Sequence, residues 1–220
     1  MVEPEPVVRV GLVEMIGERL ERMILAGTVP PGTRMNESHL AASLGTSRGP
    51  LREALRRLER AGLLESATHR GCYVRQIGLN EGRECYEIRA ELEALAGRKA
   101  CARLADADVA ALADRMEEMK SAAAAGDVAG YFRSNLAFHD AIVRCAASRV
   151  LIELYADLVK RITLFRLNNL GRPQGLRVSL AEHGAIFRAL RARDAKRAGS
   201  LLRRHTLSAL ARLTEEKTEP

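Results

Sequence analysis

The chain has 220 residues, enough for two modest domains that each bury a core. The chain contains 47% hydrophobic and 29% charged residues, which is typical of a globular protein. We find no apolar run long enough to cross a membrane and no signal-peptide pattern in the first residues, so we expect a soluble cytoplasmic protein. The net charge of +7 suits a polyanionic partner, and four cysteines without a CxxC pair argue against a disulfide framework or a zinc knuckle.

The first three predicted elements are helices. An apolar stripe over residues 13–24 has the spacing of one helical face. A short second helix is predicted at about residues 37–44, with Asn36 as its N-cap. After a tight turn at Gly45, Ser47 can cap a third helix. Helix, glycine-containing turn and helix together make a helix-turn-helix motif.

The start of the third helix carries the residues that such a motif presents to DNA. The second helix of the pair places its first residues against base edges in the major groove. Here those residues are Ser47, Arg48, Gly49 and Arg52. An arginine that pairs with O6 and N7 of guanine gives roughly 1–3 kcal/mol of discrimination. Gly49 lets the backbone approach the DNA closely, although a solvated arginine-rich helix face is the plainer alternative.

Two short strands are predicted next, at residues 63–66 and 72–75, and the turn between them would form a wing. From about residue 79 onward the pattern is helical, with six apolar stripes and no strand pattern. The fold class is therefore mainly α. We expect an N-terminal winged helix-turn-helix over residues 1–77, followed by an all-α antiparallel helical bundle over residues 78–220.

Three histidines lie within the apolar stripes of three different predicted helices. His139 follows Asn135 by one helical turn, so both face the interior, and His183 and His205 lie within two further stripes. Buried polar groups need partners, and one metal ion can satisfy three imidazoles. Neutral imidazoles suit zinc, nickel, iron or manganese, and open positions would remain for a ligand. Each histidine alone also fits a satisfied core or surface residue.

The run from Leu40 to Leu64 strongly resembles the GntR family of bacterial transcription regulators. The resemblance extends over about residues 10–76 and includes the Pro-Pro-Gly turn before the run. It implies DNA contacts from the third helix and from the wing: Arg48, Arg52, His69, Arg70 and Gly71. Gly49 stands where the family often has Thr, so a side-chain contact to the operator is absent here.

The C-terminal part resembles, more loosely, the FCD effector domain of the FadR subfamily over about residues 79–214. The segments that carry this likeness begin at Asn135 and at Glu182 and end with His205. The resemblance implies a divalent metal held by an Asp and three His, beside a carboxylate effector. Asn135 stands at the Asp position, and a neutral amide oxygen is a weaker ligand than a carboxylate.

Two arginines are candidates for pairing with the effector. Residues 86–93 resemble the opening helix of the FCD domain, in which an arginine, here Arg89, lies near the effector pocket. Arg161 also lies at the edge of its apolar stripe. Either guanidinium could bind a carboxylate through two hydrogen bonds, with a surface or interface ion pair as the alternative.

These features predict a homodimeric, sequence-specific transcription regulator, expected to be a repressor, that binds an operator in double-stranded DNA and is controlled by a small organic acid. We expect no enzymatic activity and no membrane partner. One alternative is a DNA-binding dimer with a purely structural C-terminal domain. Another is a helical metalloenzyme with Glu182 as its base, but adjacent helix residues point about 100° apart, so Glu182 should face away from a site at His183.

Overall fold

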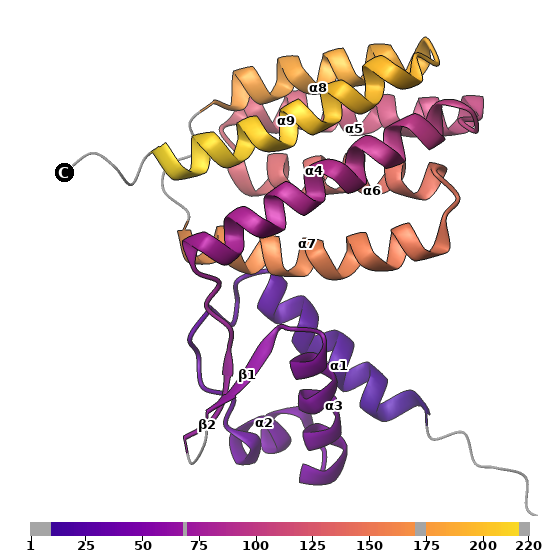
Figure 1. Ribbon diagram of the computed structural model, residues 1–220. Helices are drawn as coiled ribbons and strands as arrows, with labels where there is room; N and C mark the ends of the chain where they lie inside the picture. The colour runs from indigo at the N-terminus through magenta and orange to yellow at the C-terminus, as the bar shows by residue number, and fades with distance from the viewer. Residues whose placement is uncertain (1–9, 68–69, 170–174, 216–220) are drawn as a thin grey trace, which may run out of the picture. The chain divides into compact units, whose positions relative to one another are not determined.

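A computed structural model describes residues 10–67, 70–169 and 175–215 (Figure 1). Their contacts form two compact units. One contains the residues up to 78 together with 160–168, and the other contains 79–159 and the residues from 169 onward. Within the described ranges, no helix has the length and apolar character needed to cross a membrane.

The first unit is a small helical domain with a wing. Its elements are α1 (Val10–Leu25), α2 (Glu37–Leu44), α3 (Arg48–Arg60), β1 (Leu64–Ala67) and β2 (Gly71–Val74). Both α1 and α2 pack against α3, whose buried face is the predicted stripe of Leu51, Leu55 and Leu58. The strands pair antiparallel, each within one residue of its predicted position. The helix-turn-helix and wing are therefore present as predicted.

The helix ends confirm one predicted cap and correct another. Asn36 Oδ1 accepts hydrogen bonds from the backbone N–H groups of Ser38 and His39, at 3.0 and 3.1 Å. Ser47 occupies the predicted N-cap position of α3, but, contrary to the prediction, its side chain makes no capping hydrogen bond. The third helical residue, Pro50, has no N–H, so only the N–H of Gly49 remains as a donor for such a cap.

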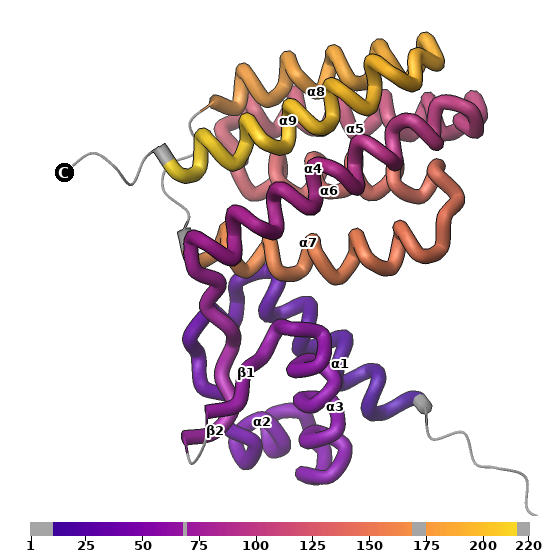
Figure 2. Tube along the Cα trace, in the orientation of Figure 1, coloured from indigo at the N-terminus to yellow at the C-terminus, as the bar shows by residue number. Residues whose placement is uncertain are grey.

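The second unit is all-helical in its described residues. It comprises α4 (Leu79–Cys101), α5 (Asp106–Ala125), α6 (Val128–Cys145), most of α7 (Arg149–Asn169), α8 (Leu176–Arg191) and α9 (Ala195–Glu215). Helix α4 packs along α9 and α6, α5 packs against α6 and α8, and α8 and α9 form a hairpin that Figure 2 traces. The mainly α fold class and the helical C-terminal bundle are confirmed.

Two glycines bring α4 and α9 close together. A Cβ atom on Gly199 of α9 would lie 2.9 Å from the carbonyl oxygen of Ala94. A Cβ atom on Gly97 of α4 would lie 3.5 Å from the carbonyl carbon of Ala198. Because neither residue has a side chain, the two backbones approach directly, and polar side chains on the same two helices can meet in the interior.

Candidate functional site

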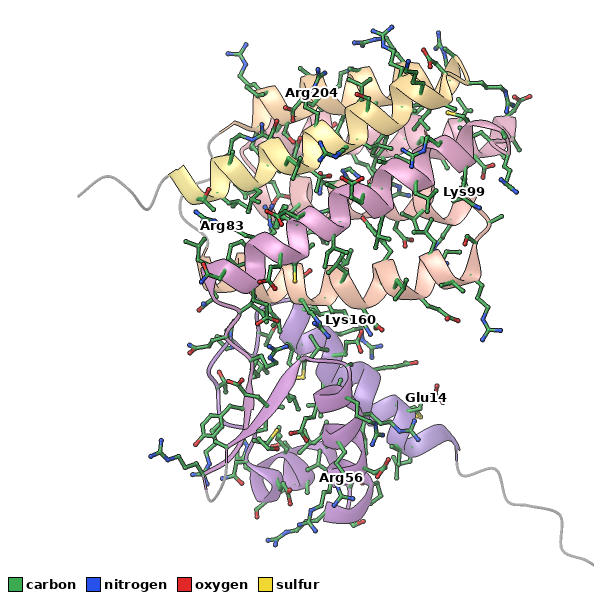
Figure 3. All side chains as sticks on the ribbon, in the orientation of Figure 1. Glu14, Arg56, Arg83, Lys99, Lys160 and Arg204 are labelled. Atoms are coloured by element: carbon green, nitrogen blue, oxygen red, sulfur yellow. The ribbon has the colours of Figure 1, made fainter. Side chains whose placement is uncertain are left out.

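The exposed start of α3 is the candidate DNA-reading surface. Ser47, Arg48 and Gly49 are all exposed there. Arg52, one turn further, pairs with Glu37 of α2, with Nη2 2.8 Å from Oε2. The Arg52 hydrogen bond lowers the pKa of Glu37, so this carboxylate stays ionised and holds the guanidinium beside the turn. Arg56 adds another exposed guanidinium on the same helix (Figure 3).

The wing lies between β1 and β2, where Ala67 pairs with Gly71. Gly71 has φ +103°, a left-handed conformation that favours glycine. Arg70 is exposed, and its backbone carbonyl accepts a hydrogen bond from the Tyr73 hydroxyl at 2.9 Å. Arg34, which the sequence analysis did not single out, places its guanidinium beside Gly71 and adds positive charge to the wing. His69 lies outside the described residues.

Three buried histidines from three helices meet in the second unit. His139 of α6, His183 of α8 and His205 of α9 each place one ring nitrogen within 4.8 Å of the other two. The Nε2 atoms of His139 and His183 are 3.2 Å apart. Two nitrogens that each bond one ion at about 2.1 Å can have this separation. The three side chains could therefore hold one metal ion.

Oxygen acceptors determine where two of these rings carry their proton. His183 Nδ1 lies 2.7 Å from the backbone oxygen of Ser179, which can only accept, so Nδ1 is the donor. His205 Nδ1 lies 2.7 Å from Glu182 Oε2, so the expectation that Glu182 faces away from the site was wrong, because its side chain reaches His205 of the neighbouring helix α9. Glu182 also pairs with Arg212, at 3.0 Å, and these two partners outweigh burial and lower its pKa. A proton on Nδ1 leaves the Nε2 lone pair of each neutral ring available as a ligand.

His139 cannot satisfy both of its neighbours as a neutral ring. Its Nδ1 lies 3.1 Å from Glu93 Oε1 without an aligned hydrogen bond, and its Nε2 faces the lone pair of His183. Whichever nitrogen holds the proton, the other turns a lone pair toward an acceptor. Burial lowers the pKa of His139 to about 4 although Glu93 opposes this, so a doubly protonated ring is disfavoured at neutral pH. A cation among the rings removes the conflict, and these residues therefore fit a metal.

Glu93 of α4 is a buried carboxylate beside the histidines. It accepts hydrogen bonds from Arg89 Nε at 2.7 Å, from the Tyr155 hydroxyl of α7 at 2.8 Å and from the Thr206 hydroxyl of α9 at 2.5 Å. Burial alone would raise the pKa of Glu93, but the Arg89 guanidinium, with the Thr206 hydrogen bond, opposes burial, and the pKa lies well below its usual range. An ionised group thus joins helices α4, α7 and α9 next to a candidate metal ligand.

The remaining candidate residues differ in their surroundings. Asn135 is half-buried on α6, one turn before His139. Arg89 is buried and already forms an ion pair with Glu93. Arg161 is exposed, its segment groups with the first unit, and its guanidinium lies near Gly62. Arg89 is therefore connected to the histidines through Glu93, whereas Arg161 belongs to a different unit.

Comparison with known proteins decides the family. The model described as "Bacterial regulatory proteins, gntR family" matches residues 12–74, and the "FCD domain" model matches residues 84–208. A Paenarthrobacter nicotinovorans protein, named "Probable D-xylose utilization operon transcriptional repressor", is 34% identical over 188 residues, which are 85% of this chain and 82% of that protein. The chain belongs to the GntR family. It has the GntR helix-turn-helix followed by an FCD domain, as in the FadR-like subfamily.

Other relatives of this GntR protein agree. The Bacillus subtilis protein "Uncharacterized HTH-type transcriptional regulator YdhC" is 32% identical over 80% of this chain and 79% of its own length. The solved structure titled "E. coli McbR/YncC" aligns over 99% of this chain and 100% of that chain, with a TM-score of 0.82 and 27% identity. This GntR protein is accordingly a DNA-binding transcription regulator and not an enzyme.

In this GntR regulator, sequence reasoning missed Glu93 beside His139 and the hydroxyls of Tyr155 and Thr206 that bond Glu93. A signal for Glu93 was present, because it follows Arg89 by four residues, the spacing that brings side chains together on a helix. Tyr155 and Thr206 had no such signal. Thr206 meets Glu93 because α9 packs along α4, and Tyr155 meets it because its side chain extends from α7 to Glu93.

Proposed function

We propose that this regulator is a homodimeric repressor whose operator affinity is controlled by a small carboxylate, bound together with a divalent metal in the FCD domain. The cluster of His139, His183 and His205 carries the proposal. Zinc, nickel, manganese or iron would suit neutral imidazoles. A divalent ion with open coordination positions supplies the positive charge that attracts an anion into a mostly apolar interior.

In this proposal the metal ion, and not an arginine, binds the effector carboxylate. Arg89 already pairs with Glu93, and Arg161 groups with the first unit, so neither guanidinium is poised for an incoming acid. Asn135, or a water molecule, would complete the metal coordination beside the three histidines. His183 and His205 are held for this task by the oxygens of Ser179 and Glu182.

The DNA-binding role is assigned to the start of α3 and to the wing. Arg48 and Arg52 would contact base edges in the major groove, while Ser47 and Gly49 let the helix approach. In the wing, His69, Arg70 and Gly71 would contact phosphates or the minor groove. Arg34, beside Gly71, would add to the phosphate contacts.

Exposed apolar side chains support a dimer through the C-terminal bundle. Ile88 and Leu95 on α4, with Val150 and Leu154 on α7, are between 40% and 66% exposed. The two helices are neighbours, because Tyr155 of α7 donates a hydrogen bond to Glu93 of α4. A second copy would bury these side chains. Two recognition helices would then read a pseudo-palindromic operator, since one helix contacts only a few bases.

The effector would act by tying helices together. Its site is formed by side chains from α6, α8 and α9, and Glu93 connects the site to α4, which begins only five residues after β2 ends at Val74. A ligand that favours one arrangement of these helices also favours one presentation of the DNA-binding units. For a repressor relieved by its effector, the ligand weakens operator binding.

The test is operator binding in three states of the protein. An operator is selected from random duplex DNA, and its affinity is measured with chelator-treated protein, with metal-loaded protein and with metal plus each of a panel of small organic acids. We expect one class of acid to change the affinity by about 5–150-fold only in the presence of metal. The His139→Ala/His183→Ala variant should bind the operator but show no response. If neither metal nor any acid changes the operator affinity, the result would instead favour a purely structural C-terminal domain.

A further inference from the structure

We propose that Glu93 is the positioning residue of the metal site. Its carboxylate holds the proton of His139 on Nδ1 and so leaves Nε2 for the ion, and Arg89 serves to hold that carboxylate in place. This inference rests on the proposed metal site. It gives Arg89 a role within the protein in place of the effector contact that the sequence indicated.

The negative charge of the carboxylate supports this assignment. Its Oε1 accepts hydrogen bonds from Arg89 and Tyr155, and its Oε2 accepts one from Thr206. His139 Nδ1 lies 3.1 Å from Oε1. A lone pair on Nδ1 would be repelled by the anion at this distance, whereas a proton on Nδ1 would be attracted to it.

The set of partners is consistent across the three imidazoles. Ser179 and Glu182 each place an oxygen 2.7 Å from the Nδ1 atom of a histidine. Glu93 occupies the equivalent place at His139. With a proton on every Nδ1, all three rings present the Nε2 atom, and the 3.2 Å contact between two of these atoms is one that a shared cation stabilises.

The burial of the ion pair also needs a reason beyond stability. The side chains of Arg89 and Glu93 are 5% and 1% exposed. The guanidinium carbon of Arg89 lies 6.0 Å from the ring centres of both Tyr86 and Tyr155. A buried ion pair contributes little net stability, because desolvation offsets the attraction, and apolar residues of similar volume often serve as well. A requirement for a carboxylate beside His139 explains why an ion pair stands here.

The main test measures metal affinity in the full-length protein. Zinc binding is followed by competition with a chromophoric chelator, so the readout does not depend on DNA. Arg89→Met/Glu93→Met removes both charges together and leaves no unpaired buried ion. We expect its zinc affinity to fall by about 10–100-fold. Arg89→Met/Glu93→Gln keeps a neutral acceptor beside His139 and should give an intermediate affinity.

The matched control removes another ion pair that includes a glutamate of α4. Arg203 of α9 pairs with Glu91 of α4, at 2.5 Å, and both side chains are exposed. Arg203→Met/Glu91→Met should bind zinc as the wild type does. Wild-type affinity in Arg89→Met/Glu93→Met would overturn the role of Glu93 while leaving the metal site intact. A wild-type protein that binds none of zinc, nickel, manganese and iron would overturn the metal site itself.

A second measurement needs no substitution and so cannot be lost to misfolding. Nitrogen-15 NMR of the zinc-loaded wild-type protein distinguishes protonated, free and metal-bound imidazole nitrogens. For His139 we expect a proton on Nδ1 and the metal on Nε2. Coordination through Nδ1, or a proton on Nε2, would contradict the proposal even if the double variant loses affinity for another reason.

Discussion

Asn135 places a neutral amide one helical turn before His139, at the position where the resemblance to FCD domains implies an aspartate ligand. Carboxylate oxygens suit manganese, whereas imidazole nitrogens suit zinc and nickel. We predict that Asn135→Asp raises the affinity for Mn²⁺ by about tenfold, or ~1.4 kcal/mol, and the affinity for Zn²⁺ by less. Chelator competition measures both. Ser121→Asp adds the same charge at an exposed site on α5 and should change neither affinity.

We predict that Arg48 and Arg52 are needed for sequence-specific operator binding. Arg48→Ala and Arg52→Ala should each weaken operator binding by roughly 1–3 kcal/mol relative to random duplex DNA, because a bidentate base contact is lost. Both side chains are exposed, so the melting temperature should change little. Fluorescence anisotropy at fixed salt gives the affinities. Arg149→Ala, at an exposed arginine of α7, is the control; equal losses in all three variants would indicate a general charge effect.

At the scale of elements, the close approach of α4 and α9 brings Glu93 and Thr206 together. We predict that Gly199→Ala lowers the free energy of unfolding by about 1–3 kcal/mol, because its Cβ would meet the backbone oxygen of Ala94 at 2.9 Å and backbone cannot move aside cheaply. Urea unfolding followed by circular dichroism measures the effect. Gly184→Ala in α8 meets only the end of the Arg188 side chain, at 3.4 Å, and should be neutral or stabilising.

At the scale of the whole molecule, the prediction concerns assembly. Leu154→Glu puts a charge into the proposed dimer face on α7 and should shift the protein toward monomers at micromolar concentration. Sedimentation velocity over a concentration series gives the dissociation constant. Val178, on α8, is similarly exposed at 53%, so Val178→Glu is a matched control and should remain dimeric. If the Leu154→Glu variant stays fully dimeric, the dimer interface does not include this face of α7.

The sequence by itself determined the order and type of the elements in the described residues. Apolar side chains recur at helical spacing, and most of them became buried faces of helices, as Leu51, Leu55 and Leu58 show in α3. Ile88, Leu95 and Leu154 also belong to predicted stripes but are exposed. The start of α2 was predictable because Asn36 bonds backbone groups only two and three residues away. The inward direction of His139, His183 and His205 followed from the same periodicity, since it needs only the turn of each helix.

Only the tertiary structure decided which of these side chains meet. The distance between His139 and His183 depends on how α6 and α8 pack, and no spacing along the chain encodes it. Packing likewise gave Glu93 its partners on α7 and α9, committed Arg89 to that carboxylate, and grouped Arg161 with the first unit. Local periodicity sets the direction of a side chain relative to its own helix. The separation between helices is set by the packing of residues far apart in the sequence, such as Gly199 against Ala94, and this separation decides whether polar groups become one site.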